Sequence, residues 1–135
     1  ASRYGNVADY LGRAADEICV VVQVETVDAV DRIAEIAAVP GVDSVFVGPG
    51  DLAASMGHLG DIGHADVQAK LAQAAAEARR LGKPCGIIGG NPEMAGRFVG
   101  YGYSWVAVGS DMSMMVGRAQ EWLGKLRGPG AAPGR

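Results

Sequence analysis

Two acidic residues, Glu25 and Asp51, each stand where an apolar stretch of the sequence gives way to polar residues. Glu25 follows residues 19–24 (CVVVQV), and Asp51 follows residues 42–47 (VDSVFV) and a Gly-Pro-Gly turn. If the two stretches are neighbouring parallel strands, about 4.8 Å apart, the carboxylates lie at one edge of the sheet and can share a divalent cation. All-oxygen ligation suits Mg²⁺ or Mn²⁺, and the cation would remove the repulsion between two close carboxylates.

The residues around these acids allow a functional and a purely structural interpretation. Strand alternation puts Gln23 on the same face as Glu25. The turn at Gly48 to Gly50 predicts that the amides of Gly50 and Asp51 form an anion-binding nest. Alternatively, Glu25 belongs to the first turn of the next helix, and Asp51 is a helix cap in a plain loop.

The rest of the pattern alternates strands with helices. The expected strands are residues 19–24, 42–47, 84–88 and 105–108; the expected helices are 27–37, 67–81, 91–99 and 112–126, after an incomplete helical lead-in at 7–18. Thr26 and Asn91 are predicted helix caps, and residues 48–63 form a Gly-rich connection. The last helix carries one apolar face that includes Met112, Met115 and Trp122, which predicts packing or an interface.

Four such units predict an α/β fold with buried parallel strands. About 110 residues of this pattern fit half of a (β/α)8 barrel, which needs about 250 residues. A small doubly wound open sheet fits the periodicity equally well, so the pattern alone leaves both architectures open.

Composition excludes several functional classes. The chain has 135 residues, 49% of them apolar, and a net charge of −3, which leaves no basic excess for nucleic acid. No apolar run is long enough for a membrane span and no secretion leader is visible, so we expect a soluble, cytoplasmic protein. Cys19 and Cys85 are predicted to be buried thiols in a reducing compartment.

The two ends of the sequence differ. The chain begins without Met, which suggests a cut within a longer protein, and it ends in a Gly/Pro/Ala run. We therefore expect one folded unit over residues 1–127 and a flexible tail over residues 128–135.

Four strings together carry a family resemblance: VVVQVET, VDSVFVGPGDLAASMG, GKPCGI and WVAVGSD. They resemble the HpcH/HpaI aldolases, which are metal-dependent class II pyruvate aldolases with a (β/α)8 barrel. The resemblance covers residues 1 to about 127 and corresponds to the second half of the barrel. The most specific feature is the Gln-x-Glu-Thr motif followed about two dozen residues later by Gly-Pro-x-Asp-Leu.

The resemblance implies roles for individual residues. Glu25 and Asp51 would hold Mg²⁺ or Mn²⁺, with Co²⁺ as a further option and no organic cofactor. Gln23 would contact the bound pyruvate, and the Gly50 and Asp51 amides would hold its carboxylate. Ile88 would line the substrate pocket, which the glycines that follow it would widen towards the aldehyde.

The family's general-base histidine and substrate-binding arginine are expected upstream of residue 1. His58 and His64 are interpreted as surface or capping residues, and Arg3 is a candidate for substrate contact. The resemblance also implies a homo-oligomer, a hexamer in the family, with the C-terminal helix exchanged between neighbours.

The resulting function is aldol cleavage or condensation of a 4-hydroxy-2-keto acid or 2-keto-3-deoxy acid, giving pyruvate and an aldehyde through a metal-stabilised pyruvate enolate. This lyase activity needs both halves of the barrel, so the present chain alone is expected to be inactive. The alternatives are a CoA-ester lyase of the citryl- or malyl-CoA type and a truncated, non-catalytic half-barrel module.

Overall fold

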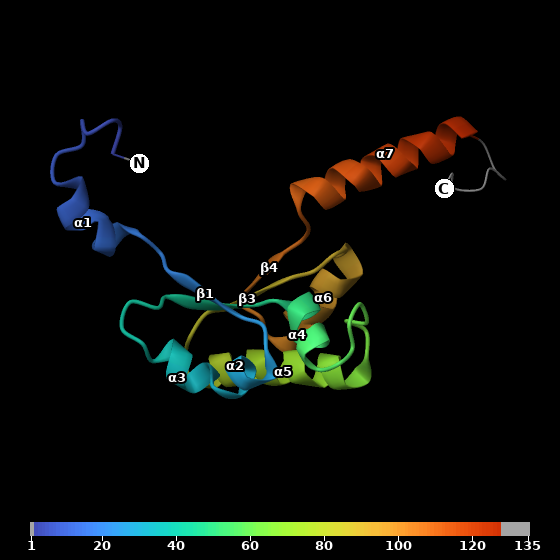
Figure 1. Ribbon diagram of the computed structural model, residues 1–135, viewed down its shortest axis with the longest axis horizontal. Helices are drawn as coiled ribbons and strands as arrows, with labels where there is room; N and C mark the ends of the chain where they lie inside the picture. Colours follow the sequence, from blue (N-terminus) through green and yellow to red (C-terminus); the bar gives the residue numbers. More distant parts are fainter. Residues whose placement is uncertain (1, 128–135) are drawn as a thin grey trace.

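The computed structural model describes residues 2–127, and four parallel strands form its single sheet (Figure 1). The strands are β1 (Val21–Val24), β2 (Ser44–Val47), β3 (Cys85–Ile88) and β4 (Trp105–Ala107), and they lie side by side in chain order. Val24 pairs with Val47, and Val47 pairs with Ile87. Each strand lies inside its predicted segment and is one or two residues shorter.

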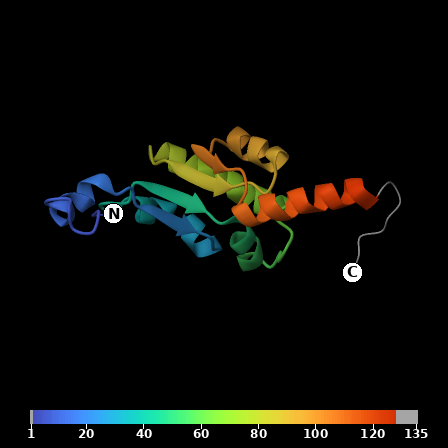
Figure 2. The same ribbon diagram turned by 90° about the horizontal axis from the view of Figure 1, so that it is seen from above.

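Helices cover one face of this sheet and leave the other open (Figures 1 and 2). The covering helices are α2 (Val27–Asp31), α3 (Ile33–Ala37), α5 (Ala65–Arg80) and α6 (Pro92–Tyr101). The predicted helix 27–37 is interrupted at Arg32 and therefore appears as α2 and α3. Both predicted caps are confirmed, since Thr26 Oγ1 accepts a hydrogen bond from the Ala29 amide and Asn91 Oδ1 accepts one from the Met94 amide.

Burial follows the alternation of the strands. Val24, Val45 and Ile87 point to the helices and are fully buried. The opposite face carries Gln23, which is exposed, and Trp105, which is 40% exposed. The core is therefore a single layer between the sheet and its helices, and the open face is the one that a complete barrel would enclose.

Trp105 fills part of the open face. Its indole lies where a Cβ at Gly86 would approach it to 2.3 Å, so a side chain at Gly86 is excluded. The ring stacks on Phe46 with centroids 5.2 Å apart, and Nε1 donates a hydrogen bond to Ser44 Oγ at 3.2 Å. The strand register puts Phe46, Gly86 and Trp105 in one row with Gln23, two residues before Glu25.

A helix forms inside the Gly-rich connection, where the sequence predicted a loop. This helix is α4 (Pro49–Ser55), which directly follows β2. Pro49 occupies a first-turn position that suits proline, and Asp51 adds a negative charge near the helix N-terminus. The sequence-based prediction of a loop followed the high glycine content of residues 48–63 and did not use these two helix signals.

The first and last helices stand away from the sheet (Figures 1 and 2). They are α1 (Tyr10–Glu17) and α7 (Asp111–Arg127), and neither contains a buried residue. The apolar face predicted for the last helix is present, but Met115, Trp122 and Leu126 are exposed. Within residues 2–127 this face has no packing partner. The prediction that the face of α7 packs within the chain is therefore wrong, and the predicted interface stays a prediction.

The prediction for the two cysteines is half right. Cys85 is buried in β3, and this burial raises the pKa of its thiol to about 12. Cys19 is exposed, because it lies in the segment between α1 and β1, ahead of the packed layers. The predicted tail, residues 128–135, lies outside the described residues, and among those described no helix is long and apolar enough to cross a membrane.

Candidate active site

The carboxyl ends of β1 and β2 meet at one edge of the sheet. Val24 and Val47 are paired, and the Gly48 amide donates a hydrogen bond to the Val24 carbonyl at 3.2 Å. The residues that follow each strand therefore leave the sheet side by side. Glu25 is the first residue after β1, and Gly48 is the first after β2.

Gln23 and Glu25 share a face, as their spacing predicts, and they also contact each other. Gln23 Nε2 donates a hydrogen bond to Glu25 Oε2 at 2.5 Å. Gln23 is exposed and Glu25 is half-buried. Glu25 precedes Thr26, the residue that caps α2, so its carboxylate belongs to the strand end and the first-turn alternative is wrong.

Gly48 makes room for this polar pair. A Cβ at Gly48 would lie 2.8 Å from Glu25 Oε2, 3.0 Å from Gln23 Nε2 and 3.0 Å from Glu25 Cβ. The first two contacts involve flexible side-chain ends, but the third involves the root of the Glu25 side chain. The absence of a side chain at Gly48 thus permits the observed position of the Glu25 carboxylate.

We predict that Gly48→Ala displaces Glu25 while the fold persists. The backbone at Gly48 has a φ of −88°, which alanine adopts freely, so the effect comes from the contact with Glu25. If Glu25 holds a divalent cation, as the family resemblance implies, the affinity for that cation should fall by about tenfold, because the carboxylate would be displaced. The matched control is Gly50→Ala, because a Cβ there meets nothing within 4 Å. Equal Mn²⁺ affinities for the two variants in calorimetry would contradict this role.

Asp51 and Gly50 lie in the first turn of α4. The first intrahelical bond of α4 runs from the Leu52 amide to the Gly48 carbonyl, so the amides of Gly50 and Asp51 precede the ladder and lack an intrahelical acceptor. Gly48, not Asp51, is the N-cap, so Asp51 as a helix cap is wrong. Gly50 and Asp51 are both exposed.

Ile88 ends β3 on the open face of the sheet. It lies two residues after Gly86, which is level with Phe46 and Trp105 on that face, and it is half-buried. Gly89 has a packing role that the sequence did not indicate, because a Cβ there would lie 2.8 Å from the Ala95 amide nitrogen in α6. Helix α6 can therefore pack directly against the end of β3.

The histidines lie in the connection between α4 and α5. His64 is the N-cap of α5, and its Nδ1 accepts a hydrogen bond from the Asp66 amide at 3.2 Å, which confirms the predicted capping role. His58 stacks on His64 with ring centroids 3.6 Å apart, a contact that sequence spacing could not predict. Arg3 lies in the turns before α1, at the opposite end of the strands from Glu25.

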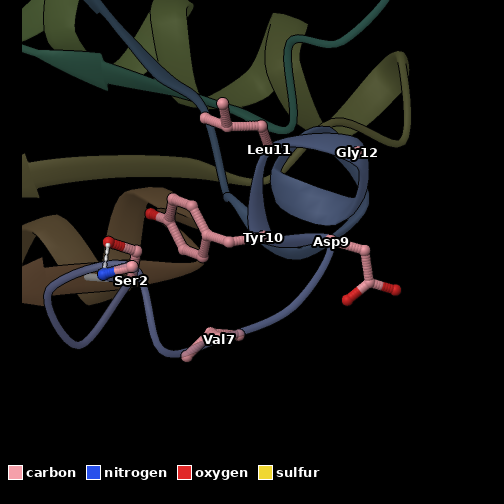
Figure 3. A pocket seen from close by; sticks show the side chains of 7 residues that line it. Ser2, Val7, Asp9, Tyr10, Leu11 and Gly12 are labelled. Carbon is pink, nitrogen blue, oxygen red and sulfur yellow. Dashed lines mark hydrogen bonds between the residues drawn. The ribbon is translucent and has the colours of Figure 1, made fainter.

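A hollow of about 440 Å³ lies beside α1 (Figure 3). Its lining includes Ser2, Val7, Tyr10 and Leu11, and Ser2 Oγ accepts a hydrogen bond from the Gly5 amide. Because α1 leads into the start of β1, this hollow lies away from the strand ends that carry Glu25 and Gly48. It is not part of the candidate site.

Four successive strand–helix units form one parallel sheet in chain order, with polar residues after the first two strands, as half of an α/β barrel would. The model of the HpcH/HpaI aldolase/citrate lyase family matches residues 3–117. The chain belongs to this family.

Individual relatives agree with this assignment. The chain is 45% identical over 128 residues to the 2-dehydro-3,6-dideoxy-6-sulfogluconate aldolase of Pseudomonas putida, covering 95% of this chain and 50% of that protein. It is 42% identical to the hydroxypyruvate/pyruvate aldolase of Pseudomonas aeruginosa, over 98% of this chain and 50% of that one. A crystal structure of a family protein from Burkholderia cenocepacia J2315 superposes with a TM-score of 0.87 at 41% identity, over 95% of this chain and 50% of that chain.

The chain therefore spans about half the length of the relatives that it matches. The predicted barrel-type architecture is confirmed, since the neighbouring structures contain this four-unit sheet as half of their fold. The doubly wound open sheet is correspondingly excluded.

Proposed function

We propose that this chain supplies the second half of the barrel of a metal-dependent aldolase. The protein in which this chain is joined to the missing first half is called the complete barrel below. The reaction is cleavage of a 4-hydroxy-2-keto acid or 2-keto-3-deoxy acid to pyruvate and an aldehyde, and the reverse condensation. The observation that carries the proposal is the Gln23–Glu25 pair at the end of β1, held against Gly48 at the end of β2. The naming of relatives at 40–45% identity as aldolases supports the same reaction class.

The strand-end residues fit a hard divalent cation. The carboxylate oxygens of Glu25 and Asp51 are the kind of ligand that Mg²⁺ and Mn²⁺ prefer, and the absence of a side chain at Gly48 lets the Glu25 carboxylate take its position at the strand end. Glu25 and Asp51 would hold the ion, with the remaining positions left for water and substrate oxygens. The bound ion would supply Lewis-acid stabilisation of the negative charge that develops on the keto oxygen when the C3–C4 bond breaks.

The other residues would bind and orient the keto acid. The amides of Gly50 and Asp51 point out of the first turn of α4 and would donate to the substrate carboxylate. Gln23 would donate from Nε2 to the keto acid once the substrate competes with Glu25 for that hydrogen bond. Ile88 would border the aldehyde portion, and the proton-transfer histidine and the substrate arginine would come from the missing half.

Gln23→Ala tests this division of roles. In the complete barrel we expect kcat/KM for pyruvate release to fall about tenfold to a hundredfold. The reason is the loss of the hydrogen bond that Gln23 would donate to the keto acid. Mn²⁺ affinity should stay within about twofold, because Gln23 binds substrate and not metal. A loss of Mn²⁺ binding in calorimetry would place Gln23 among the metal ligands and contradict the assignment.

We also propose that copies of the complete barrel associate through α7. The helix exposes Met112, Met115, Trp122 and Leu126 without a partner among residues 2–127, and a contact with a second copy would cover them. A hexamer is the assembly that the family resemblance implies.

A further inference from the structure

Three potential metal ligands meet at the start of α5, outside the strand-end site. They are His58, His64 and Asp66, and one ligand atom from each lies within 4.8 Å of the other two. Asp66 Oδ2 is 4.0 Å from His58 Nε2 and 3.8 Å from His64 Nδ1. In a tetrahedral zinc site, with bonds of about 2.0–2.2 Å, neighbouring ligand atoms are about 3.3 Å apart. The cluster is thus within about 1 Å of that geometry along two of its edges.

The backbone holds both histidines in place. The His58 amide donates to the Ala53 carbonyl at 2.8 Å, and its carbonyl accepts from the Asp61 amide at 2.9 Å. The His64 amide donates to the Asp61 carbonyl, and its carbonyl accepts from the Gln68 amide in the first turn of α5. Binding of a ligand here would therefore cost little further backbone conformational entropy.

The charge around the cluster also favours a cation. The Asp66 carboxylate lies within 4.0 Å of a ring nitrogen of each of these two histidines, and its side chain is 73% exposed. No lysine or arginine in the described part of the chain lies within 4.0 Å of its carboxylate oxygens. A metal ion bound here would neutralise the carboxylate.

The two imidazoles must rearrange to bind the same ion. Their planes are 17° from parallel, so their in-plane lone pairs do not converge. Binding of one ion by both rings would therefore require at least one imidazole to rotate about its Cβ–Cγ bond. The ion would take the Nδ1 lone pair of His64, which now accepts the capping hydrogen bond from the Asp66 amide.

We propose that His58 Nε2, His64 Nδ1 and an Asp66 oxygen form a binding site for a borderline transition-metal ion such as Zn²⁺. Two imidazoles and one carboxylate are typical of Zn²⁺, Co²⁺ or Ni²⁺ sites, whereas Mg²⁺ prefers oxygen ligands alone. The site lies beyond the C-terminus of α4, whereas Asp51 lies in the first turn of that helix, about 6 Å of helix rise before its last residue, Ser55. A metal ion bound at this site would fix the connection between α4 and α5.

The test is Zn²⁺ calorimetry on a chain without the other candidate ligands. The background carries Cys19→Ser, Glu25→Gln and Asp51→Asn, so that neither the exposed thiol nor the strand-end carboxylates contribute. We expect this background variant to bind one Zn²⁺ per chain. When Co²⁺ is added in place of Zn²⁺, the variant should show the intense visible absorption of tetrahedral Co²⁺. The melting temperature should rise with Zn²⁺ concentration, because the ion binds the folded state.

Two further variants in this background isolate the cluster. His64→Asn keeps a preferred N-cap and removes the imidazole, and His58→Gln removes the other ring. Each should weaken Zn²⁺ binding by tenfold or more without lowering the metal-free melting temperature appreciably. The proposal is overturned if the background binds no Zn²⁺, or if both variants bind it as tightly as the background does; the histidines then only stack and cap.

Discussion

Glu25→Gln and Asp51→Asn should each reduce metal-dependent pyruvate release by the complete barrel about 100- to 1,000-fold or more. Each change keeps the size of the side chain and removes the negative charge that would hold the cation. Helix α2 should be unaffected, since Thr26 caps it and Glu25 lies outside it. The assay couples released pyruvate to lactate dehydrogenase and is repeated across a range of Mg²⁺ and Mn²⁺ concentrations.

The chain offers matched controls for both substitutions. Glu35→Gln and Asp28→Asn change the same groups on α3 and α2, where the side chains are 66% and 79% exposed and pair with Arg32. Such exposed pairs contribute little, so both controls should keep the activity within about twofold. If Glu25→Gln and Asp51→Asn behave like these controls, the carboxylates have no part in the reaction.

The second large effect concerns the chain of 135 residues by itself, which should associate and show no aldolase turnover. β1 pairs only with β2, and β4 pairs only with β3, so the described sheet has two edges with unpaired backbone groups. One face of the sheet and the apolar side of α7 are also uncovered. Closing the barrel or pairing with another copy would bury these surfaces.

Light scattering coupled to size exclusion, followed by the pyruvate assay on each fraction, checks this expectation. We expect species larger than 13.8 kDa and pyruvate release at background. Two self-paired copies would duplicate Glu25 and Asp51 without supplying the groups proposed for the missing half. A 13.8 kDa monomer that cleaves a 4-hydroxy-2-keto acid would contradict both the half-barrel function and the need for those groups.

Local sequence signals predicted most of the fold. Short apolar runs between turn residues predicted all four strands, because buried parallel strands need apolar residues on both faces. Caps such as Thr26 and Asn91 act within three residues and are visible in the sequence. Helix α4 was missed because two glycines around Pro49 suggested a turn, although proline at that position also starts a helix.

The features that depend on distant parts of the chain were harder to predict. The burial of Cys85 and the exposure of Cys19 differ because one thiol lies inside the sheet and the other ahead of it. The shared face of Gln23 and Glu25 followed from alternation, but the fit of Gly48 against them required the register of β1 and β2. The stacking of His58 on His64 depends on the path of a loop, which no periodicity encodes.

The central claim is that Glu25 and Asp51 hold one divalent cation together, and Mn²⁺ binding to the complete barrel tests it most directly. Calorimetry, with electron paramagnetic resonance to count free Mn²⁺, should give a tenfold or greater loss of affinity for Glu25→Gln and for Asp51→Asn. Because both ligands serve one ion, the double variant should lose the site altogether, while His58→Gln keeps it. Unchanged Mn²⁺ affinity in Glu25→Gln and Asp51→Asn would contradict the account.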